Sequence, residues 1–331
     1  MRRGIVALLS GAFVGALLGT LLMGQAAALG TEVVDPDSVG SLASLSTWDT
    51  AGVPVFALAF SPDSALLYAA HGNRVTVWKP SDGSVVRSWP AHPGYAAGID
   101  LSPDGDLVAT AGSDAIVRIW DAASGDLVRE LSPAGTHSVA FSNDGCLVAS
   151  ADRGGNLRVW DVQSGDPVWS TDAVSRMFSL AFSPDDAAIV TAHGLPDFAV
   201  RAWSANTGEL LWDSLVHEAD AHVVAFSPNG ETVVSVGADT LVILRDAASG
   251  DVLRTLRGHS QPLFEVLFVS DQLLATGDGG GTIRLWNLET GRTLRALREH
   301  NSEVSALAFS PDGTLMASAS FDMEAILWGV P

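Results

Sequence analysis

Residues 116–126 read Ile-Val-Arg-Ile-Trp-Asp-Ala-Ala-Ser-Gly-Asp, and this phrase decides the fold. Apolar and polar residues alternate up to the tryptophan, as they do in a half-buried β-strand, and a Ser-Gly turn follows. The phrase returns with a period of about 42 residues, which predicts a repeat protein whose units bury their apolar faces against one another. The residues at the tryptophan position of the seven copies are Trp78, Trp120, Trp160, Trp203, Arg245, Trp286 and Trp328.

A second phrase, Ala-Phe-Ser-Pro-Asp-Gly or a variant of it, precedes the tryptophan position in six of the copies. The sixth copy keeps only Leu267 and Phe268 of this phrase. Pro-Asp-Gly, Ser-Gly and Asn-Gly turns separate the apolar runs, as antiparallel hairpins require. No stretch after residue 40 shows a helical period. Seven units of four short strands predict an all-β fold, a seven-bladed β-propeller with four-stranded antiparallel blades.

The two phrases together resemble the repeats of the WD-repeat family, of bacterial type, and the resemblance covers residues 41–331. It implies the same propeller fold. It implies little about activity, because this fold hosts many unrelated functions. The expected organisation is a hydrophobic segment at residues 1–28, a short acidic linker at residues 29–40 and the propeller at residues 41–331.

The closure of the ring can be predicted from the two ends of the repeat region. The seventh copy stops at residues 328–331, directly after its third strand. Residues 42–48 supply a fourth, because Trp48 precedes the aromatic residue of the next phrase with the spacing that Trp89 shows one repeat later. An N-terminal outer strand that completes the last blade removes the open sheet edge that would otherwise invite aggregation.

The first 28 residues have the pattern of an export signal. Arg2 and Arg3 precede an apolar run at residues 4–23, and Ala26 and Ala28 form an A-x-A site. Cleavage after Ala28 is one expectation. Retention as an N-terminal membrane anchor is the other, because the run is just long enough to span a bilayer. In both cases the propeller is expected outside the cytoplasm, in the periplasm or the extracellular space.

The amino-acid composition excludes some classes of binding partner. The formal net charge is −20, and Lys79 is the only lysine. Nucleic acid is therefore not expected as a partner, because binding to phosphates needs clustered Lys or Arg. The single cysteine, Cys146, excludes an intrachain disulfide. We expect it to be a small buried side chain at the start of a strand rather than a reactive thiol.

A His, an Asp, a Ser or Thr and the Trp recur at fixed offsets within the repeats. Such a set is also found in hydrolases, but here it follows the repeat period, and the WD-repeat resemblance implies a buried structural network. A network in which every polar group is paired fixes local geometry. The third, fifth and sixth copies lack a member and are expected to be less rigid. The two complete sets are His92, Asp114, Thr110 and Trp120, and His300, Asp322, Ser318 and Trp328.

Four other histidines, His71, His137, His193 and His222, are not explained by the repeat. They are expected on the face formed by the loops between second and third strands and by the connections between blades. A ligand-binding or enzymatic site at the channel mouth on that face is the alternative functional hypothesis. No two of them have the close spacing of metal ligands, so no metal site is predicted.

The leading hypothesis is a non-catalytic exported scaffold that binds a protein or peptide on a propeller surface. The sequence contains no G-x-S-x-G, no H-E-x-x-H and no phosphate-binding GKS/T loop, and no cofactor is expected. Trp169 and Trp212 stand where four other blades have Arg, with Thr171 and Ser214 two residues later. The tryptophans either compensate for lost packing or form an aromatic docking patch. The candidate partner-binding residues are Trp169, Trp212, His71, His193 and His222.

Overall fold

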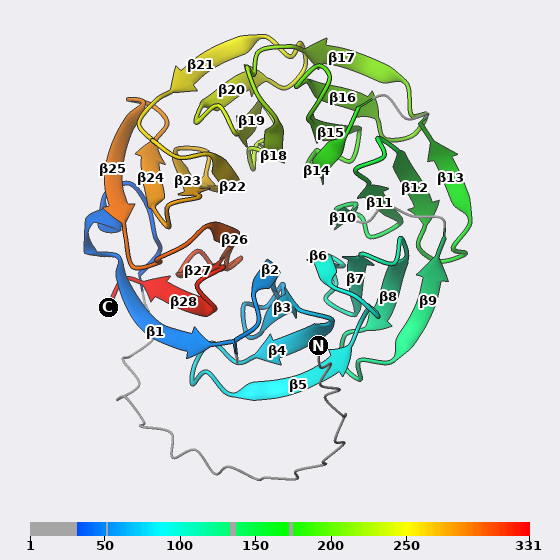
Figure 1. The fold of residues 1–331 in the computed structure, drawn as a ribbon, viewed down its shortest axis with the longest axis horizontal. Coiled ribbons are helices and arrows are strands. Elements are labelled where there is room, and N and C mark those ends of the chain that lie inside the picture. Colours follow the sequence, from blue (N-terminus) through cyan, green and yellow to red (C-terminus); the bar gives the residue numbers. More distant parts are fainter. Residues whose placement is uncertain (1–31, 51, 133–136, 172–174) are drawn as a thin grey trace, which may run out of the picture.

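The computed structural model describes residues 32–50, 52–132, 137–171 and 175–331. Seven four-stranded antiparallel sheets stand side by side around a central opening (Figure 1). The predicted seven-bladed propeller is therefore confirmed. The apolar run at residues 4–23 lies outside the described residues. Within those residues, no helix is both long enough and apolar enough to cross a membrane.

Each blade is a meander whose strands follow one another from the central opening to the rim. Blades one and two comprise β2 (Val55–Phe60), β3 (Leu67–His71), β4 (Arg74–Trp78), β5 (Val85–Pro90), β6 (Ala96–Leu101), β7 (Leu107–Gly112), β8 (Val117–Asp121) and β9 (Leu127–Leu131). Blades three and four comprise β10 (Ser138–Phe141), β11 (Leu147–Ala151), β12 (Leu157–Asp161), β13 (Pro167–Ser170), β14 (Met177–Phe182), β15 (Ala188–His193), β16 (Val200–Ser204) and β17 (Leu210–Ser214).

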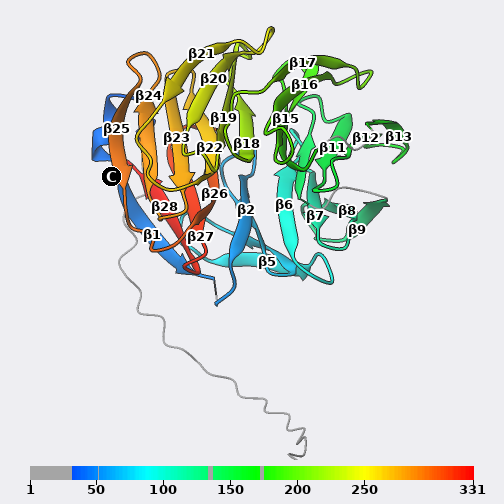
Figure 2. The same ribbon diagram turned by 45° about the horizontal axis from the view of Figure 1, so that its top comes forward.

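The remaining blades repeat this arrangement. Blades five and six comprise β18 (Ala221–Phe226), β19 (Thr232–Gly237), β20 (Val242–Asp246), β21 (Val252–Leu256), β22 (Leu263–Ser270), β23 (Leu273–Asp278), β24 (Ile283–Asn287) and β25 (Arg292–Leu297). Blade seven comprises β26 (Val304–Phe309), β27 (Leu315–Ser320), β28 (Glu324–Gly329) and β1 (Ala43–Asp49). Strands β2 and β6 lie beside the opening, and β5 and β21 lie on the rim (Figures 1 and 2).

The predicted closing strand is present. Strand β1 pairs with β28, with Ala43 opposite Gly329 and Asp49 opposite Glu324. A short 3-10 helix, η1 (Ser38–Ser41), precedes β1. The N-terminal and C-terminal parts of the propeller thus share one sheet, and β28 is paired on both of its edges, with β27 and with β1.

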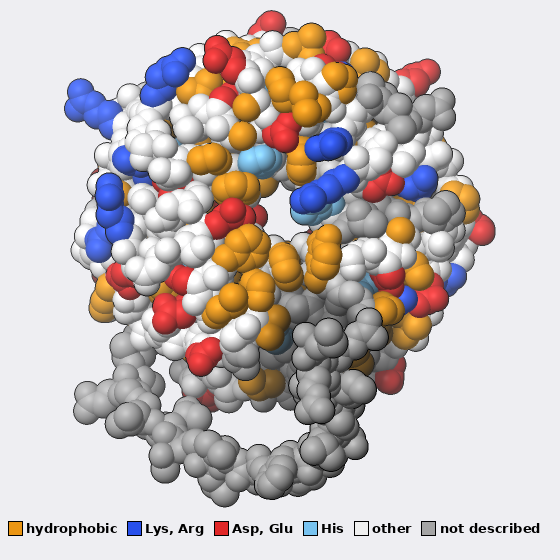
Figure 3. All heavy atoms as spheres, viewed as in Figure 1, with side chains coloured by type: hydrophobic (Ala, Val, Ile, Leu, Met, Phe, Trp, Pro, Cys, Tyr) orange, Lys and Arg blue, Asp and Glu red, His pale blue; other side chains and the backbone are white. Residues whose placement is uncertain are grey.

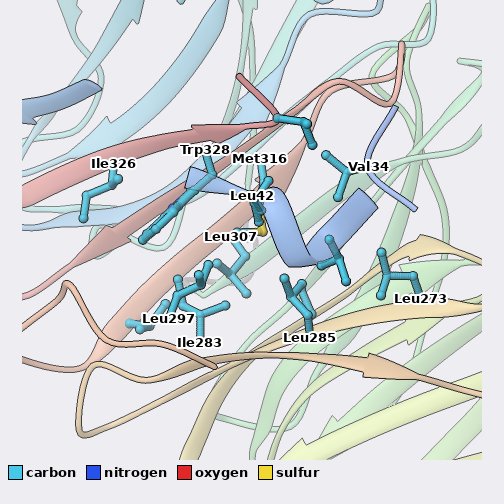
Figure 4. Packing of buried hydrophobic residues seen from close by; sticks show 14 residues of the cluster. Val34, Leu42, Leu273, Ile283, Leu285, Leu297, Leu307, Met316, Ile326 and Trp328 are labelled. Carbon is cyan, nitrogen blue, oxygen red and sulfur yellow. The ribbon is translucent and has the colours of Figure 1, made fainter. Parts of the chain in front are cut away.

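The apolar core is divided into clusters, each shared by neighbouring blades. In the cluster between blades six and seven, Leu42 and Trp328 are fully buried together with Leu285 (Figure 4). Burying a side chain of this size contributes about 1.5–3 kcal/mol relative to leaving it exposed. Because each cluster needs two blades, each blade is stable only beside its neighbours.

The acidic residues of the hairpin turns have a local structural role. In the turn after β6, Ser102 Oγ donates to Asp104 Oδ1 at 2.6 Å, and the same oxygen accepts the Asp106 N–H at 3.1 Å. The hydrogen bond from Ser102 lowers the pKa of Asp104, with that N–H acting in the same direction. Gly105 completes the turn at φ +77°, a conformation that favours glycine.

Cys146 does not have the buried position expected from the sequence. Its side chain is exposed, because the residue still belongs to the turn before β11 rather than to the strand. Its N–H donates to Asp144 Oδ1 at 2.9 Å. The charge of Asp144 raises the pKa of the thiol, so the thiol carries less of the reactive thiolate at neutral pH.

Candidate functional site at the central channel

The His-Asp-Thr-Trp set of blade two is a closed hydrogen-bonded chain. His92 Nδ1 lies 2.8 Å from Asp114 Oδ1, and His92 Nε2 lies 2.9 Å from Thr110 Oγ1. Trp120 Nε1 donates to the same hydroxyl at 2.8 Å. Thr110 is fully buried and His92 nearly so. With all of its groups engaged in this way, the set has no free nucleophile to offer a substrate.

Blade seven contains the same chain. His300 Nδ1 lies 3.0 Å from Asp322 Oδ2, and His300 Nε2 lies 2.8 Å from Ser318 Oγ. Trp328 Nε1 donates to Ser318 Oγ at 2.8 Å. Both sets lie inside blades, away from the channel, and hold the second and third strands together.

Blade six has a complete network, contrary to the expectation from the sequence. Asp278, at the end of β23, lies 2.6 Å from His259 Nδ1 and so replaces the missing acid at Gly280. Its other oxygen accepts the N–H groups of Gly280 and Thr282. The acid of this network comes from two positions earlier in the chain than in blades two and seven. The glycine-rich turn that follows Asp278 accommodates this shift.

His193 and His71 also belong to blade interiors rather than to an exposed face. His193 is fully buried and bonds to Thr191 at 2.7 Å and to Ser175 at 2.8 Å, so it takes the place of the network histidine in blade four. His71 Nε2 lies 2.6 Å from Thr76 Oγ1. His193 is therefore not on an exposed face as expected. His71 is half-buried at the end of β3, and its ring turns back to a hydroxyl of its own blade.

The structure favours the packing interpretation of Trp169 and Trp212. Trp169 Nε1 donates to Ala205 O at 2.7 Å and Trp212 Nε1 donates to Ala247 O at 2.9 Å, each in the turn of the following blade. Trp212 is buried. In blade two, Arg129 donates to the equivalent turn of blade three. The indoles therefore form the same bridge between blades as the arginines that they replace.

A ring of side chains surrounds the central channel at one position of the repeat, four residues before the last aromatic or leucine of each inner strand. Two of its members, His137 and His222, were expected at the channel mouth, but the recurrence of this position with the repeat period was not recognised from the sequence. Five of its seven residues carry aromatic or imidazole rings. In order around the channel they are Phe56, Ala97, His137, Phe178, His222, Phe264 and Ser305.

These rings form two arcs around a cavity of about 420 Å³. The first arc runs from His137 through Phe178 and His222 to Phe264, with successive centroids 6.1, 5.4 and 4.7 Å apart. His222 and Phe264 are stacked, with an interplanar angle of 13°. His222 Nδ1 also donates to Leu263 O at 2.7 Å, which fixes the ring.

The second arc lies where blades two and seven have the small residues Ala97 and Ser305 at the ring position. Phe56 lies 5.4 Å from Tyr95 and 5.8 Å from Phe321, measured between ring centroids. Tyr95 and Phe321 come from a connection between blades and from a loop, respectively. Because the residue type at each of these two positions changes from blade to blade, the recurring motifs of the sequence did not single them out.

Charged side chains occupy opposite sides of the cavity. Arg153 and His137 line it at blade three, and Glu265 and Glu303 line it where blades six and seven meet. Figure 3 shows acidic side chains on one side of the central opening and basic side chains on the other, with hydrophobic side chains between them. The channel mouth is thus polarised as well as aromatic.

Burial shifts the pKa values of these groups. Burial, together with the negative charge of Glu303, raises the pKa of Glu265 well above its usual value, although the Leu307 N–H opposes this. Burial also raises the pKa of Glu303. Burial and the charge of Arg153 lower the pKa of His137 to about 4. His137 is therefore neutral at pH 7, and its Nε2, 2.6 Å from Arg153 Nη2, accepts the hydrogen bond.

Hydroxyl groups beside the channel are engaged with the backbone of neighbouring blades. Ser138 Oγ accepts the Leu180 N–H at 3.3 Å, and Ser179 Oγ accepts the Val224 N–H at 3.4 Å. Ser305 Oγ donates to Val55 O at 2.6 Å. These bonds join the inner strands. Within the described residues, no group of three or more His, Cys, Asp or Glu is arranged to hold a metal ion.

Two family models match parts of the chain. The model described as "WD domain, G-beta repeat" matches residues 41–79, 83–121, 250–287 and 291–329. The model described as "Outer membrane protein assembly factor BamB" matches residues 113–253, which fill the gap between the second and third of these segments.

Similar proteins are known from animals and plants. The chain is 33% identical over 146 residues to "WD repeat-containing protein 55" of Mus musculus, which covers 43% of this chain and 38% of that protein. It is 27% identical over 321 residues to "Transcriptional corepressor LEUNIG_HOMOLOG" of Arabidopsis thaliana, covering 95% of this chain and 39% of that protein. Since the chain spans less than half of either relative, their activities as whole proteins do not transfer to it directly. These relatives are eukaryotic and give no support to the bacterial type expected from the sequence.

Proposed function

We propose that this chain, a WD-repeat β-propeller, is a non-catalytic scaffold that binds a protein or peptide partner at the mouth of its central channel. The observation that carries the proposal is the pair of aromatic arcs around the 420 Å³ cavity. Large rings with a polar edge are favoured anchors at protein interfaces, because they bury much area at little cost in side-chain entropy. The proposed docking site replaces the rim patch at Trp169 and Trp212.

The non-catalytic part of the proposal rests on the state of the reactive groups. The His-Asp-hydroxyl sets, such as His92, Asp114 and Thr110, are enclosed within blades and bonded to one another. At the channel, Ser138 and Ser305 bond to backbone groups of the next blade. A nucleophile needs an adjacent general base and access to the substrate, and none of these hydroxyls combines both.

A second function, the binding of a small ligand at the same mouth, is favoured by the ionisable groups there. His137, His222, Glu265 and Glu303 converge on one cavity, and pockets with a few convergent polar groups and shifted pKa values are typical ligand sites. Native mass spectrometry of the purified protein distinguishes the two functions. A small molecule retained at one per chain would favour the ligand-binding alternative.

We also propose that the protein is exported and works outside the cytoplasm, secreted or held by an uncleaved N-terminal helix. Arg2, Arg3, the apolar run at residues 4–23 and Ala28 support this. So does the similarity of residues 113–253 to a family described as an outer membrane protein assembly factor. The net charge of −20 supports a partner other than nucleic acid.

Fractionation of the native cells followed by N-terminal sequencing tests the export proposal. A mature protein that starts at Leu29 in the periplasm or medium indicates cleavage. A full-length protein in the membrane fraction indicates an anchor. A full-length protein found only in the cytoplasm would overturn the proposal.

Site-specific photo-crosslinking tests the location of the partner. A benzophenone amino acid is placed at Tyr95, which is 45% exposed at the channel mouth, or at Val252, which is 43% exposed on the rim of blade five. We expect one partner band from Tyr95 and none from Val252, and a weaker Tyr95 band when Phe178→Ala removes part of the aromatic surface. Equal capture at the two positions, or capture at Val252 alone, would contradict a channel-mouth site.

A further inference from the structure

The two charged sides of the cavity restrict the chemistry of what can bind there, and this inference rests on the proposed function. Seven blades place blade three opposite the junction of blades six and seven, as the positions of β10, β22 and β26 show (Figure 1). Arg153 lies in the loop between β11 and β12, and Glu265 and Glu303 lie in and just before inner strands across the channel. A bound segment therefore meets opposite charges at its two ends.

The acidic side lacks a cation of its own. Among the described residues, the salt bridges involve neither Glu265 nor Glu303. The Leu307 N–H bonds to Glu265, but burial and the charge of the half-buried Glu303 outweigh this and raise the pKa of Glu265. A cationic group between them would remove the repulsion and restore their ionised forms.

The basic side presents an exposed guanidinium that contacts a histidine and an aromatic ring. Arg153 Nη2 bonds to His137 Nε2 at 2.6 Å, and Arg153 Cζ lies 5.6 Å from the Phe178 ring centroid. Those two contacts orient the planar group, and no carboxylate pairs with it in the described part of the chain. Guanidinium donors suit a carboxylate, which they bind through two parallel hydrogen bonds.

The aromatic arcs connect the two charged sides. One side of the path is formed by Phe178, His222 and Phe264, and the other by Tyr95, Phe56 and Phe321. An apolar or aromatic body placed between them would be in contact with rings on both sides. The cavity volume of about 420 Å³ lies in the range of sites for small ligands, so it holds a few residues of a chain rather than a folded domain.

We infer that the channel mouth binds a short peptide segment that carries a cationic side chain and a carboxylate separated by an apolar residue. The cation lies at Glu265 and Glu303, the carboxylate lies at Arg153, and the apolar residue lies between the aromatic arcs. The match of charge in both positions sets the direction in which the segment lies across the channel.

Binding of the cation is coupled to proton release. Glu265 faces Glu303 and shares the cavity with His137, His222 and Arg153. Because its pKa is raised in the free protein, a cation that stabilises the carboxylate displaces a proton. Affinity for the cationic peptide therefore rises with pH through the raised pKa of Glu265, whereas affinity for a neutral peptide does not.

Isothermal titration of the full propeller with four synthetic peptides tests the inference. The probe is acetyl-Lys-Phe-Glu-amide, and the controls replace Lys, Glu or both by Gln. We expect the bipolar peptide to bind best, with about a tenfold loss for each Gln, or about 1.4 kcal/mol. Glu265→Gln, which keeps an acceptor for the Leu307 N–H, should abolish the preference for Lys, and Arg153→Gln should abolish the preference for Glu. Glu289→Gln and Arg292→Gln, exposed on blade six, serve as matched controls with no effect.

The outcomes separate this inference from the proposed function. Equal affinities for the four peptides would overturn the bipolar site, while crosslinking of a partner from Tyr95 would leave the scaffold function intact. If none of the peptides binds, the bipolar inference is likewise wrong. Competition by free lysine as strong as that by the peptide would assign the site to a small zwitterion instead. If Tyr95 also captures no partner, the proposed function falls as well.

Discussion

Blades two and five have different residues at the tryptophan position of the repeat, and both residues are buried against the preceding blade. In blade two, Trp120 packs beside Trp89 of the preceding blade, with ring centroids 6.2 Å apart, and donates to Thr110. In blade five the equivalent residue is Arg245, which is fully buried. Its Nη1 donates to Ser235 Oγ at 2.5 Å, as the indole does to Thr110. The hydroxyl acceptor is retained although the donor has changed from a neutral ring to a cation.

The arginine at position 245 and the serine at position 214 depend on each other. Arg245 Nε donates to Ser214 Oγ at 3.2 Å, across the boundary with blade four. At the position of Ser214, every other blade except blade three, which has Thr171, has an apolar residue. Leu256 of blade five, for example, packs on the tryptophan of the following blade. The serine is therefore a hydrogen-bond partner for the buried guanidinium, not a gap filled by Trp212. Arg245 Nη2 still has no partner within the described residues, and burial lowers the pKa of the group to about 10.

The largest effect is expected when the residue of blade five is placed in blade two. Trp120→Arg removes an indole from a core cluster and buries a cation beside Trp89, which offers no acceptor like Ser214. We expect a loss of about 3–5 kcal/mol in the free energy of unfolding, from lost burial and an uncompensated charge. Urea unfolding followed by tryptophan fluorescence measures it. A loss below about 1 kcal/mol would show that the partner serine is unnecessary.

The reverse exchange should stabilise the protein. Arg245→Trp with Ser214→Leu gives blade five the apolar pair found elsewhere in the ring and removes an unpartnered buried donor. We expect a gain of about 1–3 kcal/mol. The two single variants complete a double-mutant cycle. The double variant should be more stable than the sum of the two single effects implies, because each single variant leaves one member of the pair without its partner. Additive effects would contradict the coupling.

A smaller effect concerns the pH dependence of blade two. Burial lowers the pKa of His92 despite the opposing effect of Asp114, so the unfolded chain takes up a proton near pH 6.5 that the folded chain binds only at lower pH. The resulting stability is present above pH 6.5 and is lost as pH falls toward the folded-state pKa. We expect His92→Gln to flatten the pH dependence of unfolding between pH 7 and 5.5, by at most about 1.4 kcal/mol per pH unit. An unchanged slope would exclude His92 as a contributor.

The smallest effect is expected at the rim. Trp169→Arg replaces an indole that donates to Ala205 O by the residue that makes the same bridge in blade two. We expect a change within about 1 kcal/mol, as for surface substitutions that keep their contacts, and no change in partner capture from Tyr95. A folded variant that no longer gives the crosslink would restore Trp169 as a docking residue.

The repeat could be predicted from the sequence wherever the structure follows the period. The seven blades, the closing strand at residues 42–48 and the partners of His92 all depend on counting from one tryptophan to the next. Where a loop breaks the count, the sequence was misleading. Asp278 replaces the missing acid from a strand end, and His193 enters its network from β15 rather than from a connection between blades.

The candidate site was only partly accessible to the same reasoning. Phe178 and Phe264 occupy a periodic position that a comparison of the copies could have found. Tyr95, Arg153 and Glu303 lie in loops and connections whose residue types differ from blade to blade, and only the closed ring brings them to one cavity. Their proximity is a property of the three-dimensional ring, because it joins residues from blades that are not neighbours in the chain.

The pairing of β1 with β28 has a consequence for the order of events during synthesis. Strand β1 leaves the ribosome among the first segments of the propeller, yet its partner, Glu324–Gly329, is among the last. Domains otherwise begin to fold from the N-terminus as the chain emerges. The first strand must therefore wait, with its edge open to wrong partners, for almost the whole of translation. A circular permutant that begins at Val55 and joins residues 43–49 after β28 would shorten that delay to one hairpin.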